Sequence, residues 1–136
     1  MPTVWLMLLQ YLEQTGKALP HLKRVVIGGS ACPRAMTEKF EKNYGVEVVH
    51  AWGMTEMSPL GSLCTMKPDY AGLTGEARLD IAQKQGFAPF GVEMKVTDDD
   101  NVEHPWDGRT FGRLKVRGPA VARAYYGGAG ADQFDE

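Results

Sequence analysis

The stretch LKRVVIGGSACPRAMTEKFEKNYGVEVVHAWGMTE, residues 22–56, decides the fold that we expect. Residues 22–27 are rich in β-branched side chains and stop at a glycine pair, as a buried strand does. Pro33 suits the first turn of a helix that Gly45 ends, and a second strand follows over residues 46–52. A strand, a helix and a strand of these lengths predict a right-handed unit in a parallel sheet, and therefore an α/β fold.

Glycine-bearing segments follow both predicted strands. Gly28-Gly29-Ser30 comes after the first, and WGMTE, residues 52–56, comes at the end of the second. The carboxyl ends of parallel strands share one edge of the sheet, where open α/β sheets bind ligands. A glycine pair before a helix lets the backbone and the exposed N–H groups approach a flat or anionic ligand. Taken alone, the first segment is more simply a tight turn that leads into a helix.

The WGMTE segment gathers an aromatic face, a glycine, a hydroxyl and a carboxylate at one strand end. Trp52 can stack on a purine, Thr55 can donate to a phosphate oxygen, and Glu56 can hold the magnesium that accompanies ATP. The structural alternative makes Trp52 a core residue and Thr55-Glu56 the start of a helix. These residues by themselves leave both interpretations open.

The rest of the chain divides around this unit. We expect a helix before it that ends at Gly16, whose core-facing side is formed by Val4, Met7, Leu8, Tyr11 and Leu12. Residues 59–89 are predicted to be irregular, with a short helix around 76–84. Alternating side chains predict antiparallel strands near 92–97 and 113–117, and residues 98–101 predict a turn. The expected parts are a partial α/β subdomain (1–60), a connection (61–90) and a partial β-barrel-like subdomain (91–136).

The composition is that of an ordinary globular chain, with 43% apolar and 24% charged residues and a net charge of −2. It gives no basic surface for nucleic acid and no predicted membrane span. Cys32 and Cys64 show neither a CxxC spacing nor a second pair, which favours the reducing cytoplasm over a disulfide or zinc framework. We expect Cys32 to pack rather than react, and His50 to line a pocket rather than act as a base.

Three segments carry a family resemblance. GGSACP (28–33), AWGMTE (51–56) and GRLKVRGP (112–119), the last followed by Tyr125-Tyr126, resemble signature segments of the adenylate-forming, AMP-binding superfamily in the same order. Residues 85–93 resemble the stretch that opens the family's small β-barrel. Within this superfamily, Trp52 and the PWDG segment at 105–108 make the chain most similar to medium- and long-chain fatty acyl-CoA synthetases.

The resemblance implies a role for each matching residue. Thr55 would contact phosphate and Glu56 would serve magnesium, and these two are the candidate catalytic residues. Those that would border the adenine and acyl sites are Gly28, Gly29, Ser30, Ala51, Trp52, Gly53 and Met54. Catalysis would be electrostatic, through positioning and charge neutralisation, and would need no protein nucleophile.

The resemblance implies a parent enzyme that is an acyl-CoA synthetase. It would use ATP and magnesium to join a carboxylic acid, by resemblance a fatty acid, to AMP, and would then pass the acyl group to coenzyme A. The alternatives are an adenylating enzyme that uses a carrier-protein thiol and a non-catalytic nucleotide- or acyl-binding module. The family's phosphate loop, ribose-binding aspartate and C-terminal lysine have no counterpart in these 136 residues. We therefore expect a fragment that is inactive alone, with an open sheet edge that favours homo-oligomers.

Overall fold

The computed structural model describes residues 1–135, which form two compact units. The first unit consists of residues 1–53 and 62–87, and the second of residues 54–61 and those from 88 onward. Residue 136, the last of the predicted β-barrel-like part, lies outside the described residues.

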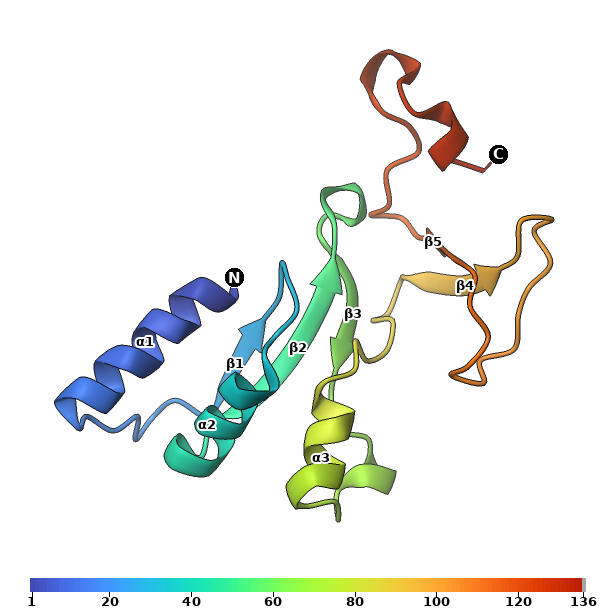
Figure 1. Cartoon of the computed structure of the whole chain (residues 1–136). Coiled ribbons are helices and arrows are strands. Elements are labelled where there is room, and N and C mark those ends of the chain that lie inside the picture. The colour runs from blue at the N-terminus through green and yellow to red at the C-terminus, as the bar shows by residue number, and fades with distance from the viewer. Residues whose placement is uncertain (136) are drawn as a thin grey trace. The chain divides into compact units, whose positions relative to one another are not determined.

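The first unit is built on the predicted strand, helix and strand (Figure 1). Strand β1 (Arg24–Ile27) pairs in parallel with β2 (Glu47–Gly53), with Val25 opposite Val48, and helix α2 (Arg34–Tyr44) connects them. The strand order is β1-β2-β3, with β3 spanning Leu60–Cys64. The expected parallel α/β unit is confirmed.

Both predicted helix ends are confirmed as well. Helix α1 (Pro2–Thr15) ends at Gly16 and α2 ends at Gly45, and both glycines adopt the left-handed conformation, with φ of 66° and 63°. This conformation is one that glycine reaches without steric cost, and it returns the backbone N–H groups to the last helical carbonyls. Pro33 precedes the first helical residue of α2.

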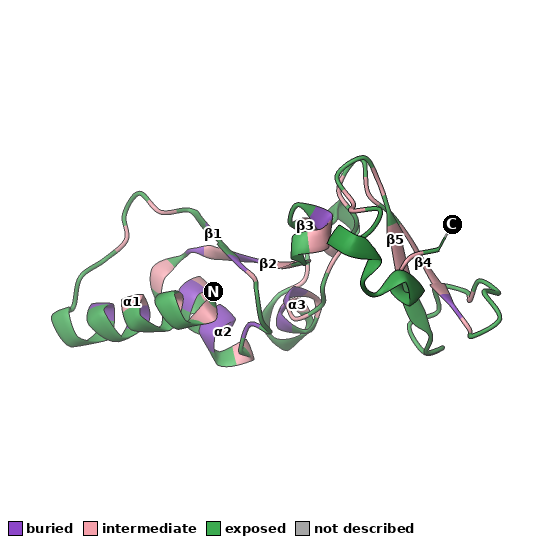
Figure 2. Cartoon of the chain, turned by 90° about the horizontal axis from the view of Figure 1, so that it is seen from above, coloured by how far each residue is buried: buried purple, intermediate pink, exposed green. Residues whose placement is uncertain are grey.

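The core lies between the helices and the β1–β2 pair, and Figure 2 shows buried positions on α1, α2 and the strands. Phe40 of α2 is fully buried, and the ring of Trp5 meets it edge to face at 6.0 Å between centroids. The predicted core-facing side of α1 is wrong in part: Leu12 is buried, but Val4 and Met7 are about two-thirds exposed. Because α1 is apolar on more than one side, its periodicity permits two orientations, and Leu9 and Leu12 occupy the core.

The stretch predicted to be irregular contains two regular elements. Helix α3 (Gly75–Ala82) confirms the short helix, whereas β3 contradicts the irregular assignment of residues 60–64. The strand is held by partners distant in sequence. Leu63 and Phe87 exchange two backbone hydrogen bonds of 2.9 Å, and the Ser62 hydroxyl donates to the Gln85 carbonyl at 2.7 Å. The same stretch includes a 3-10 turn at Pro68–Tyr70.

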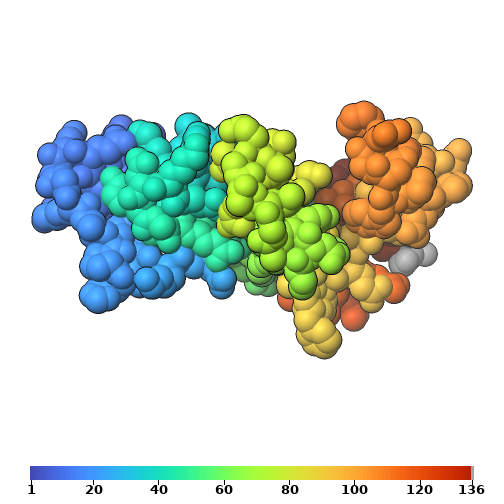
Figure 3. Space-filling view, turned by 90° about the horizontal axis from the view of Figure 1, so that it is seen from below, coloured from blue at the N-terminus to red at the C-terminus, as the bar shows by residue number. Residues whose placement is uncertain are grey.

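Helix α3 is joined to α2 by ion pairs, and the two segments lie side by side in Figure 3. Arg34 of α2 donates to Asp80 at 2.7 Å and to Glu76 at 2.5 Å. Arg78 of α3 in turn contacts both carboxylate oxygens of Glu41, at 3.0 and 3.1 Å. These ion pairs link α3 to α2.

The second unit contains the predicted antiparallel pair. Strand β4 (Glu93–Thr97) pairs with β5 (Arg113–Arg117), with Met94 opposite Val116. Within the described residues the two strands do not close into a barrel. The remaining elements are short 3-10 turns: η1 (Thr55–Met57), η3 (Tyr126–Gly128) and η4 (Ala131–Gln133).

Aspartates organise the connection between β4 and β5. Asp98 accepts hydrogen bonds from the backbone N–H groups of Asp100 and Val102, both at 2.9 Å, which confirms the predicted turn. In the PWDG segment, Asp107 accepts from the backbone N–H groups of Arg109 and Thr110, both at 2.8 Å. These bonds lower the pKa of Asp107 to about 2, so the carboxylate is ionised at neutral pH. Among residues 1–135, no helix is both long and apolar enough to cross a membrane.

Candidate functional site

The two glycine-bearing segments meet at one hollow in the first unit. It has a volume of about 270 Å³ and lies where the backbone leaves the carboxyl ends of β1 and β2. Its lining comprises Gly29, Ser30, Ala31, His50, Ala51, Trp52, Gly53 and Gln85. Five of the predicted binding residues therefore share one hollow, at the sheet edge where an open α/β fold places its ligand.

Gly28 brings the two strand ends together without lining the hollow. A Cβ atom at this position would lie 2.7 Å from the Ala51 carbonyl oxygen and 3.2 Å from the Ala51 Cβ. Only a residue without a side chain permits this approach, so Gly28 sets the spacing between the end of β1 and the end of β2. Gly29 then turns the chain at a φ of +84° and exposes the loop that leads to α2.

Trp52 is half-buried near the end of strand β2 and lies outside the core cluster of the first unit. It lines the hollow, so part of its indole surface is open to a ligand. Stacking of Trp52 on a purine stays a prediction. Met54, which follows Gly53, is 45% exposed and belongs to the second unit.

His50 is only 3% exposed and also lines the hollow. The backbone N–H of Cys32 donates to its Nε2 at 3.3 Å. Nε2 is then the unprotonated nitrogen of the neutral ring, and Nδ1 carries the hydrogen. Nδ1 has no hydrogen-bond partner among residues 1–135. A buried donor without a partner is costly, so a polar ligand atom in the hollow would stabilise this arrangement.

Cys32 is packed inside the first unit. Its side chain is 3% exposed, its Sγ lies 3.5 Å from the Thr37 hydroxyl, and burial raises the pKa of the thiol. A neutral, enclosed thiol is a poor nucleophile, which fits the packing role that we predicted.

Thr55 and Glu56 lie in the second unit, on the single turn η1. Met57, which is 1% exposed, anchors this turn, while Thr55 is exposed. The Ser58 N–H donates to the Thr55 carbonyl at 3.2 Å and closes the turn. The two predicted catalytic residues thus begin a short helix, as the structural alternative stated. Thr55 is exposed with its hydroxyl group, and Glu56 contributes a carboxylate.

Glu56 is held by two residues that are far along the chain. The Tyr125 hydroxyl donates to its Oε1, and the backbone N–H of Ala122 donates to its carbonyl at 2.7 Å. The Tyr125 hydrogen bond lowers the pKa of Glu56 and raises that of Tyr125, so Glu56 is a carboxylate at neutral pH. The role of Tyr125 was not predicted, because no spacing in the sequence relates residue 125 to residue 56.

The donor set around Glu56 fits magnesium that is delivered with a nucleotide. No group of three or more His, Cys, Asp or Glu side chains within residues 1–135 could hold a metal alone. Magnesium is commonly bound through one or two carboxylates together with substrate phosphates and water. One ionised carboxylate with an oxygen left over by Tyr125 is therefore a suitable ligand.

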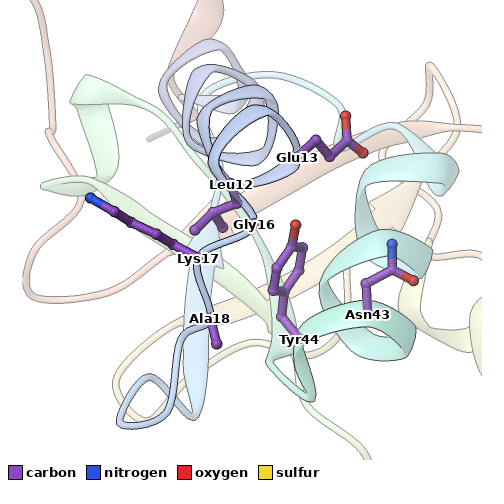
Figure 4. A pocket seen from close by; sticks show the side chains of 7 residues that line it. All are labelled: Leu12, Glu13, Gly16, Lys17, Ala18, Asn43 and Tyr44. Carbon is purple, nitrogen blue, oxygen red and sulfur yellow. The ribbon is translucent and has the colours of Figure 1, made fainter.

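Another hollow of the first unit, of about 380 Å³, lies between the C-terminal ends of α1 and α2 (Figure 4). It is lined by Leu12, Glu13, Gly16, Lys17, Ala18, Asn43 and Tyr44. It includes neither glycine-bearing segment, and its Lys17 amino group already donates to the Tyr11 hydroxyl at 2.6 Å. We assign no ligand to it.

The parallel strands of the first unit, with a hollow at their carboxyl ends, define an α/β protein with a candidate ligand site. Comparison with known families gives the narrower class, since the family described as AMP-binding enzyme matches residues 1–126. The chain belongs to this family, which confirms the resemblance that its signature segments show.

Two of the relatives are named as CoA ligases. The chain is 43% identical over 125 residues to a medium-chain-fatty-acid–CoA ligase of Ectopseudomonas oleovorans and 46% identical over 125 residues to a 3-methylmercaptopropionyl-CoA ligase of Ruegeria lacuscaerulensis. Each match covers 92% of this chain and 23% of the relative. The fold is similar to that of a long-chain-fatty-acid-CoA ligase from Archaeoglobus fulgidus, with a TM-score of 0.74 and 24% identity over 98% of this chain and 26% of that one.

Proposed function

We propose that these residues form part of an ATP-dependent acyl-CoA synthetase, which joins a carboxylic acid to AMP and then transfers the acyl group to coenzyme A. The observation that carries the proposal is the hollow at the ends of β1 and β2, where both glycine-bearing family segments meet. The two relatives that are 43% and 46% identical over 125 residues are named as CoA ligases, which supports coenzyme A as the acceptor.

The acid that we propose is aliphatic. The two relatives are named for a medium-chain fatty acid and for 3-methylmercaptopropionate, and both acids carry a flexible, largely apolar chain without a ring. Because both relatives match almost equally well, the chain length is left to a direct comparison of substrates.

In this proposal the first unit binds the flat and apolar parts of the ligand. Trp52 offers an aromatic face to adenine, and Gly29, Ser30, Ala51 and Gly53 let the ligand approach the backbone closely. Gly28 maintains the spacing of the two strand ends. The unpaired Nδ1–H of His50 donates to a polar atom of the bound ligand.

The second unit supplies the polar groups. The Thr55 hydroxyl donates to a phosphate oxygen, and Glu56 holds magnesium through its carboxylate. Bound magnesium would neutralise charge on the phosphates during attack by the substrate carboxylate. Met54 is proposed to border the adenine and acyl sites. The residues position and neutralise, so no nucleophile of the protein is needed.

Some expectations extend beyond this site. A reducing, cytoplasmic location is proposed because Cys32 and Cys64 are buried free thiols. Homo-oligomers are proposed because the outward side of α1 leaves Val4, Met7 and Tyr11 exposed. The division into residues 1–60, 61–90 and 91–136 is also retained as a proposal about subdomains.

The test is acid-dependent exchange of pyrophosphate into ATP by the full-length enzyme, with octanoate, 3-methylmercaptopropionate and benzoate compared. We expect exchange with the aliphatic acids and a loss of at least about tenfold in Glu56→Gln. Glu103→Gln, an exposed carboxylate outside the site, is the matched control and should leave the rate unchanged.

Two results would contradict the proposal: no exchange with any acid, or equal rates in Glu56→Gln and the control. Transfer of the acyl group to a carrier-protein thiol in place of coenzyme A would establish the alternative acceptor. Nucleotide binding without exchange would establish the non-catalytic module.

A further inference from the structure

Two hydrogen bonds join the turn η1, which carries Glu56, to the segment around Tyr125. The Tyr125 hydroxyl donates to the side chain of Glu56, 69 residues earlier in the chain. The backbone N–H of Ala122 donates to the Glu56 carbonyl at 2.7 Å. One bond therefore fixes the backbone of Glu56 and the other fixes its carboxylate.

The Tyr125 ring is itself held in place. It meets the ring of Phe134 edge to face, with 5.2 Å between centroids and 80° between planes. The turn at Gly130 passes so close that a Cβ there would lie 3.2 Å from Tyr125 Cδ2. Contacts on the ring therefore orient the Tyr125 hydroxyl in addition to its hydrogen bond with Glu56.

The neighbouring tyrosine shows that this arrangement is specific to position 125. Tyr126 is fully exposed, whereas Tyr125 is 39% exposed and contributes both the ring contact and the hydrogen bond. The two residues have the same chemistry and differ in their contacts, so Tyr126 is a matched control.

We propose that Tyr125 is a positioning residue for Glu56: its hydroxyl occupies Oε1 and fixes the carboxylate so that Oε2 is presented to the magnesium that accompanies ATP. This inference rests on the proposed function, in which Glu56 is the magnesium ligand. A carboxylate has room for several partners on its two oxygens, so one hydrogen bond to Oε1 leaves Oε2 available. Groups that orient a metal ligand in this way commonly change metal affinity by about 10- to 100-fold when they are removed.

The experiment uses the full-length enzyme and the variant Tyr125→Phe, which removes the hydroxyl and retains the ring that contacts Phe134. Calorimetry measures the affinity for ATP with excess magnesium and, separately, for AMP with a chelator and no magnesium. We expect Tyr125→Phe to weaken the magnesium-dependent binding by about tenfold and to leave AMP binding unchanged. Tyr126→Phe should change neither affinity.

A second comparison tests whether Tyr125 acts through Glu56. In the Glu56→Gln background, the added Tyr125→Phe should change ATP–magnesium affinity by less than about twofold, because coupled residues are not additive. An additional tenfold loss in that background would overturn the proposal. The proposal would also be overturned if Tyr125→Phe weakened the binding of both ligands equally, which a purely structural role predicts, or if it weakened the binding of neither.

Failure of the proposed function has a different signature. If the unsubstituted enzyme and Tyr126→Phe bind neither ligand, the function itself is wrong and the inference falls with it. If they bind both ligands and Tyr125→Phe binds equally well, only the inference is overturned. Thermal unfolding of each variant accompanies the titrations, and equal midpoints show that the fold is intact.

Discussion

The first unit is organised by a packed core, and the second by hydrogen bonds and close turns. Phe40 and Ile27 of the first unit are fully buried, with contacts from both helices and strands. In the described part of the second unit Met57 is the one buried apolar side chain, while Phe90 and Phe111 are almost completely exposed. A two-stranded sheet without a core is marginal in water, so polar contacts have a larger share in the order of the second unit.

The difference shows how each half of the predicted site is positioned. The hollow depends on close packing, because Gly28 lets the end of β1 approach Ala51 of β2. Glu56 depends on hydrogen bonds from Tyr125 and Ala122. Substitutions that disturb the packing should therefore change the shape of the hollow. Substitutions that remove a hydrogen bond should change the orientation of the Glu56 carboxylate.

The largest expected effect is that of Phe40→Ala. Loss of a buried ring with its Trp5 contact should lower the free energy of unfolding of the chain by about 3–5 kcal/mol, measured by urea denaturation. Phe111→Ala, at a ring that is 96% exposed, should change it by less than about 0.5 kcal/mol. Similar losses in both variants would mean that the two units do not differ in this way.

Gly28→Ala should have the next largest effect. The added methyl group meets backbone of β2, which cannot move aside freely, so we expect a loss of about 1–3 kcal/mol and weaker AMP binding in the full-length enzyme. Gly72→Ala is the control, since a Cβ there would have no atom within 4 Å. Unchanged stability and binding in Gly28→Ala would show that the strand ends separate easily.

Arg78→Met tests the ion pair between α3 and α2. Both carboxylate oxygens of Glu41 contact the guanidinium, and the two side chains are 27% and 15% exposed, so we expect a loss of about 1 kcal/mol that decreases at high salt. In the second unit Arg117 pairs with Glu93 at 2.6 Å, but these side chains are 79% and 69% exposed. Arg117→Met should therefore cost less than about 0.5 kcal/mol, and a larger cost than for Arg78→Met would reverse the ranking.

The smallest effect concerns the turn at Asp107, which touches only the second unit. Its folded pKa of about 2 lies below the ordinary 3.8, so its stabilising contribution is present above pH 3.8 and is lost as the pH falls toward 2. In Asp107→Asn, the Arg109 and Thr110 amide hydrogens should exchange several-fold faster at pH 6, as measured by NMR. The difference from the unsubstituted chain should fall to about half near pH 2, where half of the carboxylate is protonated, and largely disappear by about pH 1. Asp69→Asn, in the first unit, should leave these amides unchanged, and a difference that is undiminished at about pH 1 would exclude ionisation as the cause.

Local patterns predicted the elements whose signals lie close together in the sequence. The β-branched run of β1, Gly45 at the end of α2 and the alternation in β4 each specify an element within a few residues. Strand β3 was missed because Leu60–Cys64 contains a glycine and no β-branched residue. It lies beside β2 in the sheet, and Leu63 also pairs with Phe87 and Ser62 with Gln85, more than twenty residues away.

The candidate site divides in the same way. The meeting of the glycine-bearing segments followed from strand order, since parallel strands end at one edge. The acceptor role of His50 Nε2 and the tyrosine bound to Glu56 depend on contacts across 18 and 69 residues. Spacing along the chain carries no information about such contacts.

The link between Glu56 and Tyr125 has a consequence for synthesis on the ribosome. Chains grow at about 5–20 residues per second, so the 69 residues that separate the partners take about 3 to 14 s to add. The strand, helix and strand of the first unit can associate during that interval, before Tyr125 has been added to the chain and can bind Glu56. The carboxylate thus reaches its final environment later than the strand and helix residues that precede it.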